Sequence, residues 1–133
     1  MKYEKEFLFV YGTLMRTHNH AMSDFLQRHS TFWANGYFYG KLYDLGKYPG
    51  AILSLNNEDK VYGQIFQLNN ANAVLPPLDR YEGVGEDVYS REKINAITET
   101  GERLECWVYL YCKAVNHHIY IASGNYHAYL LGR

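Results

Sequence analysis

Residues 7–14 have the sequence FLFVYGTL, and this stretch decides the fold. Its odd positions up to 11 are aromatic and its even positions up to 10 are aliphatic, so both faces of an extended segment are apolar. A strand of this composition is covered on both sides and lies inside a sheet rather than at its edge. We therefore expect a central strand over residues 6–12, ending at Gly12, where a turn begins.

Outward from this strand, the chain alternates between short strands and two helical segments. The patterns predict helices over 20–29 and 70–82, and strands over 36–45, 51–55, 60–68, 88–97 and 103–113. The second and third of these strands are separated by a short polar stretch and are expected to pair as a hairpin. Residues 114–133 are expected to be irregular. This order predicts an α+β fold around a curved, mixed sheet or small barrel, in one domain over residues 1–133.

The ends of the two helical segments carry local signals. Asn19 is a candidate N-cap for the first helix. Pro76 and Pro77 lack backbone N–H groups, so we expect them to divide the second segment into a short first turn and a helix that starts near Pro77. Gly83 is expected to end that helix, because glycine readily takes the left-handed conformation found after a helix C-terminus.

Charge balance and cysteine spacing bear on partners and location. The chain has 13 basic and 14 acidic residues, a net charge of −1 and no basic run, which argues against nucleic acid as a partner. Residues 1–6 are charged and only a short apolar stretch follows, so neither a signal peptide nor a membrane span is expected. Cys106 and Cys112 fall in one expected strand, roughly 20 Å apart and too distant for a disulfide. Both are expected to be core thiols, and reduced cysteines indicate a cytoplasmic protein.

The loop after the first strand is a candidate anion-binding site. Tyr11, Gly12, Thr13 and Leu14 follow a strand and precede an expected helix, a frame in which successive backbone N–H groups can face an anion. An ordinary turn, with Gly12 present for its backbone freedom, is the commoner interpretation of such a segment. The segment has neither the second glycine nor the Lys-Ser/Thr pair of a phosphate loop.

Glu82 is a candidate acid/base. Leu75, Leu78 and Glu82 are spaced to share one face of a helix. If the leucines face the core, Glu82 points inward, where desolvation and the negative end of the helix dipole would raise its pKa toward the range that suits proton transfer. The alternative is a surface glutamate paired with Arg80 or with a basic side chain of the next strand, which is the commoner situation for a single Glu.

The remaining nucleophiles and candidate ligands predict no further chemistry. The six histidines lie at positions 18, 20, 29, 117, 118 and 127, and no cysteine or carboxylate cluster completes a zinc site. The serines lack the context of a nucleophile elbow. We therefore expect no metal site.

Several of these segments, taken together, resemble one protein family. They are FVYGTL at 9–14, GKLYDLGKYPGA at 40–51, VYGQIF at 61–66, LDRYEG at 78–83, YSR at 89–91 and WVYLY at 107–111. In this order they resemble the γ-glutamylcyclotransferase-like family, including its γ-glutamylamine cyclotransferase branch and small bacterial relatives. The likeness spans residues 7 to about 111 and implies a small mixed β-barrel flanked by helices.

The resemblance also implies an activity and a site. The backbone of Tyr11, Gly12, Thr13 and Leu14 would hold the γ-glutamyl group, and Glu82 matches the position of the family's catalytic glutamate. The reaction would release 5-oxoproline and a free amine from a small-molecule γ-glutamyl substrate, with no metal or cofactor. A non-catalytic module that binds a small ligand on the same fold is the alternative.

Overall fold

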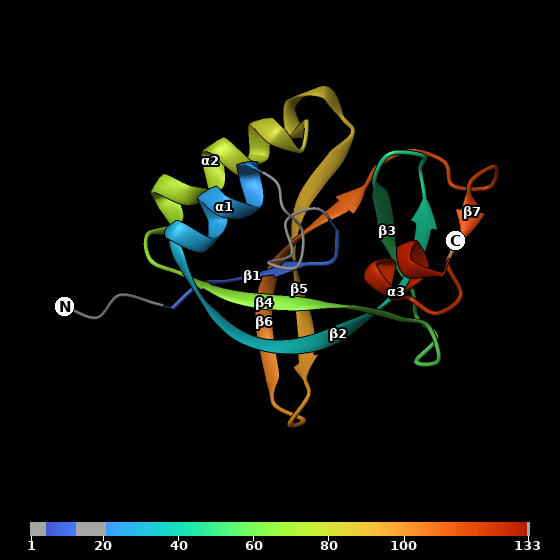
Figure 1. Cartoon of the computed structure of the whole chain (residues 1–133), viewed down its shortest axis with the longest axis horizontal. Helices are drawn as coiled ribbons and strands as arrows, with labels where there is room; N and C mark the ends of the chain where they lie inside the picture. The colour runs from blue at the N-terminus through green and yellow to red at the C-terminus, as the bar shows by residue number, and fades with distance from the viewer. Residues whose placement is uncertain (1–4, 13–20, 133) are drawn as a thin grey trace.

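Five strands close into a barrel, and the strand predicted to be central is one of them, with a neighbouring strand on each side. The computed structural model describes residues 5–12 and 21–132 (Figure 1). The barrel strands are β1 Phe7–Val10, β2 Ser30–Asp44, β4 Lys60–Leu68, β5 Tyr89–Thr98 and β6 Arg103–Tyr111. Their hydrogen-bonded order is β2, β4, β1, β6 and β5, and β5 pairs with β2 to close the ring. Since β1 is antiparallel to β4 and parallel to β6, the sheet is mixed. The α+β fold and small mixed barrel expected from the sequence are confirmed.

Both faces of β1 are covered, as its sequence predicts. Phe9 points into the barrel, where its ring meets that of Phe38 edge-on with 5.1 Å between centroids. Leu8 and Val10 belong to a second apolar cluster that lies outside the barrel wall. Burial of each such side chain stabilises the fold by about 1.5–3 kcal/mol. Because its side chains alternate, β1 contributes to both the core inside the barrel and the apolar cluster outside it.

Two helices cover one outer side of the barrel. Helix α1 spans Ala21–Arg28 and helix α2 spans Ala71–Tyr81, and Figure 1 shows them together over β1 and β4. Their inward side chains Leu26, Val74, Leu75 and Leu78 are buried in the outer cluster. The short strands β3 (Pro49–Leu53) and β7 (Ile119–Tyr120) and helix α3 (Tyr126–Leu131) lie on the other side in this view.

The expected break at the two prolines is wrong, because α2 runs continuously through Pro76 and Pro77. The carbonyls that would accept from those two residues belong to Asn72 and Ala73, which are exposed. Water can therefore replace the missing backbone bonds on the outer side of the helix. The expected end is confirmed: Gly83 has φ 68° and directly follows the C-cap residue of α2.

Other departures from expectation come from long-range pairing. β3 pairs with β2 over Gly40–Asp44, and no pairing of β3 with β4 is found in the part of the chain that the structure describes, so the expected hairpin is wrong. β2 begins at Ser30 rather than at 36, and its register with β4 shifts between Phe32 and Ala34. The region expected to be irregular contains β7 and α3. β3, β7 and α3 are short, so tertiary contacts decide their structure more than local pattern does.

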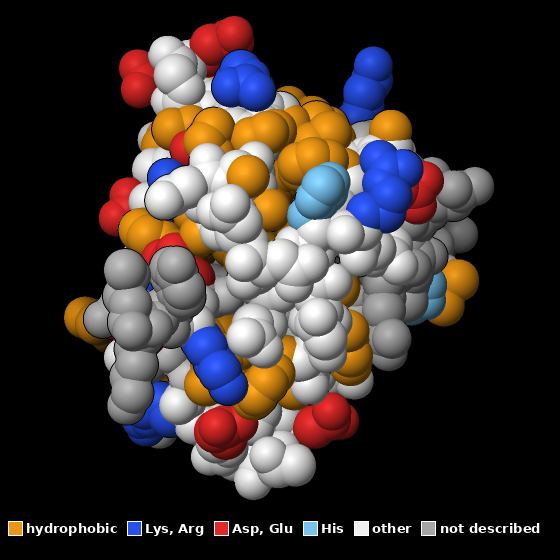
Figure 2. All heavy atoms as spheres, turned by 90° about the vertical axis from the view of Figure 1, so that its left-hand side faces the viewer, with side chains coloured by type: hydrophobic (Ala, Val, Ile, Leu, Met, Phe, Trp, Pro, Cys, Tyr) orange, Lys and Arg blue, Asp and Glu red, His pale blue; other side chains and the backbone are white. Residues whose placement is uncertain are grey.

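The surface drawn in Figure 2 has no large patch of one charge, and both cysteines are free thiols. On the face drawn in Figure 2, basic and acidic side chains are scattered around an apolar region rather than gathered by sign. No helix within 5–12 and 21–132 is long and apolar enough to cross a membrane. Both cysteines are free, as expected; Cys106 is buried, whereas Cys112 is exposed just after β6 ends, so its expected place in the core is wrong.

Candidate active site

A cavity of about 520 Å³ opens where β1 ends, beneath the C-terminus of α2 and beside the turn between β2 and β3. Its lining residues are Phe9, Val10, Tyr11, Gly12, Lys47, Tyr48, Pro49, Arg80, Tyr81, Glu82, Gly83, Glu86, Val88, Tyr89 and Tyr109. Glu86 ends the 3₁₀ turn η1 (Val84–Glu86), which follows α2. The wall is therefore mostly aromatic and apolar, with few charged groups, as in many small-ligand pockets.

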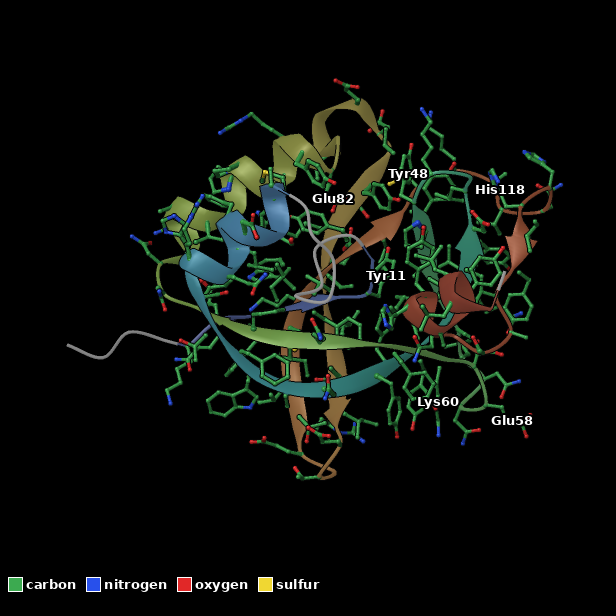
Figure 3. The ribbon with its side chains drawn as sticks, viewed as in Figure 1. Tyr11, Tyr48, Glu58, Lys60, Glu82 and His118 are labelled. Carbon is green, nitrogen blue, oxygen red and sulfur yellow. The ribbon has the colours of Figure 1, made fainter. Side chains whose placement is uncertain are left out.

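Three of the five residues predicted from sequence meet in this cavity. Tyr11 and Gly12 enter from the end of β1, and Glu82 enters from the end of α2. Figure 3 shows Tyr11, Tyr48 and Glu82 around one region, with Glu58 and Lys60 well away from it. Thr13 and Leu14 lie outside the described residues.

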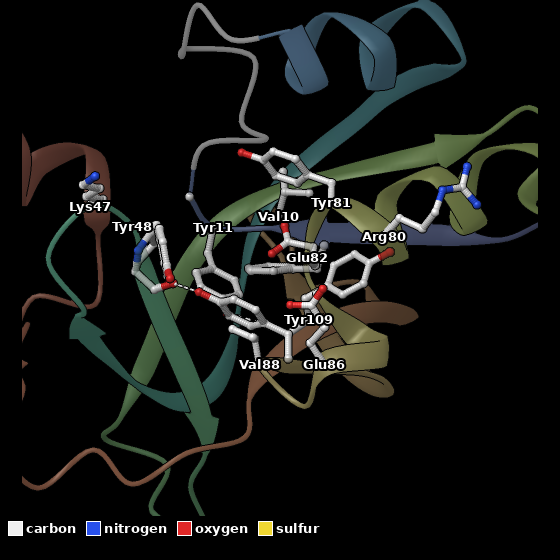
Figure 4. A pocket seen from close by; sticks show the side chains of 15 residues that line it. Val10, Tyr11, Lys47, Tyr48, Arg80, Tyr81, Glu82, Glu86, Val88 and Tyr109 are labelled. Atoms are coloured by element: carbon white, nitrogen blue, oxygen red, sulfur yellow. Dashed lines mark hydrogen bonds between the residues drawn. The ribbon is translucent and has the colours of Figure 1, made fainter.

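Helix α2 sets the position of Glu82. Glu82 is the C-cap residue, and its backbone N–H donates to the carbonyl of Leu78 at 2.9 Å. It shares a helical face with Leu75 and Leu78, both buried, as the spacing predicts. Figure 4 shows the carboxyl group among the aromatic side chains of the cavity, while the guanidinium of Arg80 points away.

Among the residues that the structure describes, no cation pairs with the carboxyl group of Glu82. The basic side chains of β5 are engaged elsewhere: Arg91 pairs with Asp79 at 2.8 Å, and Lys93 pairs with Glu105 at 3.4 Å. Within 5–12 and 21–132, no ion pair to Glu82 is formed. Burial raises the pKa of the Glu82 carboxyl from 4.5 to about 7, because desolvation disfavours its charged form.

Tyrosine hydroxyls tie the cavity wall together. The hydroxyl of Tyr11 donates to the carbonyl of Tyr109 at 2.5 Å and accepts from the N–H of Ala51 at 3.2 Å. The hydroxyl of Tyr89 donates to the carbonyl of Pro49 at 2.6 Å. Burial, and after it the charge of Glu82, raises the pKa of Tyr11 above its ordinary value, so this phenol stays neutral. These side chains are therefore a fixed wall around the carboxyl group, not acids.

Close packing explains the glycine of the predicted loop. A Cβ atom on Gly12 would lie 2.7 Å from Cγ and 3.0 Å from Cδ of Pro49. Proline is stiff and β3 holds it, so a side chain at position 12 would have to displace backbone. Gly12 is needed for this contact between β1 and β3.

Sequence reasoning missed part of the wall. Tyr48, Tyr89 and Tyr109 line the cavity, but they come from a turn and two strands that only the closed barrel brings together. The alternation in β6, which places Tyr109 on the aromatic face of its strand, was the one available signal. No group of three or more His, Cys, Asp or Glu side chains that could hold a metal ion is found among the residues that the structure describes.

Comparison with known proteins places this cavity in a family context. The family model described as "Gamma-glutamyl cyclotransferase, AIG2-like" matches residues 8–128. A Methanocaldococcus jannaschii protein with the provisional name gamma-glutamylcyclotransferase is 27% identical over 93% of this chain and 98% of its own. A gamma-glutamylcyclotransferase family protein of Citrobacter rodentium is 31% identical over 90% and 93%. An AIG2-like protein of Mus musculus, 21% identical, shares the fold with a TM-score of 0.73 over 90% of this chain and 88% of its own. The chain belongs to the gamma-glutamyl cyclotransferase, AIG2-like family.

Proposed function

We propose that this protein is a γ-glutamyl cyclotransferase in which Glu82 is the general acid and base. The observation that carries the proposal is a carboxyl group without a cationic partner among the described residues, in a mostly apolar cavity. The family membership supports the reaction class, and Tyr11 and Gly12 border the same cavity as the proposed acid/base. The substrate is a γ-glutamyl amine or γ-glutamyl amino compound.

The reaction is an intramolecular acyl transfer. The α-amine of the γ-glutamyl group attacks the γ-carbonyl carbon and forms the ring C–N bond. The bond from that carbon to the leaving nitrogen then breaks, which gives 5-oxoproline and a free amine. Glu82 takes the proton that the attacking nitrogen loses and delivers it to the leaving nitrogen, so protons balance without a co-reactant. Backbone N–H groups after Tyr11 are proposed to stabilise the oxyanion.

The raised pKa of Glu82 suits this proton transfer. An α-ammonium group has a pKa of about 8, so it is mostly protonated at pH 7 and must lose a proton before it attacks. Transfer to a carboxylate of pKa about 7 is uphill by about 1.4 kcal/mol. The same transfer to a carboxylate of the ordinary pKa of 4.5 would be uphill by about 5 kcal/mol. Burial of Glu82 therefore removes several kcal/mol from the cost of generating the nucleophile.

The second contribution to the proposed rate enhancement is to hold the substrate in a folded conformer, with its α-amine close to its γ-carbonyl carbon. Nucleophile and electrophile belong to one molecule, and well-oriented intramolecular reactions reach effective molarities of about 10⁵–10⁸ M. The tyrosine wall, with its hydroxyls fixed to backbone carbonyls, presents a rigid surface for this purpose.

The experiment is a substrate panel with 5-oxoproline as the measured product. The protein is incubated with γ-glutamyl-ε-lysine and with several γ-glutamyl dipeptides, and product is quantified by mass spectrometry. We expect 5-oxoproline from at least one compound with wild type and none above background with Glu82→Gln. Binding of γ-glutamyl compounds without turnover of any of them would instead favour a ligand-binding module. Equal turnover by the two proteins would remove Glu82 from the mechanism.

A further inference from the structure

Helix α2, which carries Glu82 at its C-terminal end, contains two residues that cannot donate a backbone hydrogen bond. Pro76 and Pro77 lie in the middle of the helix, and neither has an N–H to donate to the preceding turn. Proline is by far the least favourable residue inside a helix, and here two are consecutive. The last turn of α2 therefore needs support from outside the helix if Glu82 is to keep one position.

Such support is present one turn before Glu82. We propose that Asp79 is a positioning residue, which ties the last turn of α2 to strands β5 and β6 and so holds Glu82 in the cavity. This inference rests on the role proposed for Glu82.

The contacts of Asp79 are close and involve both of its oxygens. Arg91 Nε donates to Oδ1 at 2.8 Å, and Arg91 Nη2 donates to Oδ2 at 3.2 Å. The hydroxyl of Tyr109 donates to Oδ1 at 2.7 Å. Arg91 and Tyr109 stand opposite each other on β5 and β6, so one carboxylate fastens the helix to two strands. Paired Arg nitrogens on a carboxylate form the most directional of the common ion pairs.

The ion pair is partly shielded from water. The side chains of Asp79 and Arg91 are 25% and 23% exposed, and the guanidinium lies 4.3 Å from the centre of the Trp107 ring. The hydrogen bond from Arg91 to Asp79 raises the pKa of the arginine above its ordinary value. A partly shielded pair with two directed hydrogen bonds is stronger than a fully exposed ion pair, which solvent screens.

The same contacts reach the wall of the cavity. The hydroxyl of Tyr109 donates a hydrogen bond to Asp79, and its backbone carbonyl accepts one from Tyr11. Tyr109 also lines the cavity. Asp79 therefore fixes both the helix turn that carries Glu82 and a tyrosine that keeps water from it. Loss of the Asp79 contacts would let the last turn of α2 and the Tyr109 ring move apart, and water would then reach the carboxyl group of Glu82.

The environment of Glu82 can be measured directly, without any substrate. Among the described residues, the other titratable or charged ones that line its cavity are Tyr11 just after β1, Lys47 and Tyr48 from the turn before β3, Arg80 and Tyr81 from α2, Glu86 from η1, Tyr89 from β5 and Tyr109 from β6. The side-chain carboxyl carbon of Glu82, labelled with ¹³C and assigned by its absence in Glu82→Gln, reports the midpoint of its titration by NMR. Water entry lowers this midpoint, because it stabilises the ionised form.

The test compares Asp79→Ala, Asp79→Asn and Tyr109→Phe with wild type. We expect the midpoint of Glu82 to fall by at least about one pH unit in Asp79→Ala, and by less in Asp79→Asn, which can still accept from Tyr109. With a substrate that is turned over, kcat should fall by about 10- to 100-fold while KM changes little, because the carboxyl group is misplaced and binding groups are not. Tyr109→Phe removes one oxygen and keeps the ring, so it provides the test if Asp79→Ala fails to fold.

A matched control and a rescue separate positioning from a general loss of stability. Lys93 lies on β5 near the same Trp107 ring, at 4.6 Å, and pairs with Glu6 and Glu105 instead of Asp79. Lys93→Gln should leave the Glu82 midpoint and kcat unchanged. Replacing both prolines of α2 by alanine restores two backbone donors, and in that background Asp79→Ala should shift the midpoint less.

The outcomes distinguish this inference from the proposed reaction. If the midpoint of Glu82 is the same in folded Asp79→Ala, Tyr109→Phe and wild type, the tie does not position Glu82. An equal shift in Lys93→Gln, or the same shift with and without the prolines, would also overturn it. If no γ-glutamyl compound is turned over but the midpoint still moves, the proposed reaction fails and the positioning role of Asp79 stands.

Discussion

Two cavities of similar size differ in the charged group that each contains. The first, of about 520 Å³, holds Glu82; the second, of about 590 Å³, lies where β2, β4 and β5 meet beside the start of α3. The second is lined by Asn35, Gly36, Tyr37, Tyr62, Gly63, Gln64, Ile97, Thr98, Glu99, Gly101, Asn125 and His127. Volume alone does not separate them, and neither does the presence of tyrosines.

The state of the carboxylate separates the two cavities. Glu99 lies exposed beside the second, and its Oε1 accepts from the N–H of Asn35 at 3.4 Å. Glu82 is partly buried behind tyrosines, and burial raises its pKa to about 7. Because only the environment of Glu82 brings the pKa of a carboxyl group close to neutral pH, the first cavity is the better candidate for the proposed acid/base chemistry.

The largest expected effect comes from removing the charge in each cavity in turn. Glu82→Gln should lower kcat/KM by about 10³-fold or more, because the proton carrier is lost while the shape of the side chain remains. Glu99→Gln is the matched change at the second cavity. It should leave kcat/KM within about twofold, because the exposed Glu99 carboxylate makes only a long hydrogen bond to Asn35 and lies outside the first cavity. Steady-state release of 5-oxoproline measures both. A comparable loss in Glu99→Gln would break the distinction between the cavities.

The second effect concerns stability, and its sign follows from the raised pKa of Glu82. Between pH 4.5 and about 7 the folded protein keeps a proton on Glu82 that the unfolded chain has released. The free energy of unfolding therefore decreases as pH rises through this window, by about 2–3 kcal/mol for this group once its partial exposure is allowed for.

Glu82→Gln should lack this decrease. Its free energy of unfolding, minus that of wild type, should grow by about 2–3 kcal/mol from pH 4.5 to 7.5, as measured by urea denaturation at each pH. Since all other titrating groups are shared, the difference isolates Glu82. A difference that is flat with pH would mean that Glu82 has an ordinary pKa in the folded protein.

The side of the first cavity formed by β1 and α2 could be predicted from the sequence, whereas the side formed by β5 and β6 could not. Alternation in β1 and helical spacing in α2 gave the strand, the inward face of the helix and the direction of Glu82, because these depend on residues close in sequence. Tyr89 and Tyr109 were missed as wall residues because their positions depend on closure of the barrel. The continuity of α2 through Pro76 could not be predicted either, since it depends on exposure of the carbonyls that lose their donors.

The third prediction tests the close contact at the mouth of the first cavity. Gly12→Ala places a Cβ atom 2.7 Å from Cγ of Pro49 and should displace the end of β1, which lowers kcat/KM by about 10- to 100-fold. Gly85→Ala is the matched control, because a Cβ atom there meets nothing within 4 Å and φ is not positive. If Gly12→Ala retains full activity, the backbone around position 12 does not take part in holding the substrate.

The smallest effect is expected at the second cavity, where the comparison is most easily broken. Tyr62 lines this cavity, is 40% exposed and contacts the ring of Tyr37 with 5.8 Å between centroids. Tyr62→Ala should enlarge the cavity and cost about 1 kcal/mol of stability, the value of one aromatic pair with partial burial, as measured by urea denaturation. It should leave kcat/KM within about twofold, because among the described residues none that lines the first cavity also lines the second. A tenfold loss of kcat/KM without further destabilisation would mean that the second cavity is coupled to the first, and that the environment of Glu82 alone does not define the functional site.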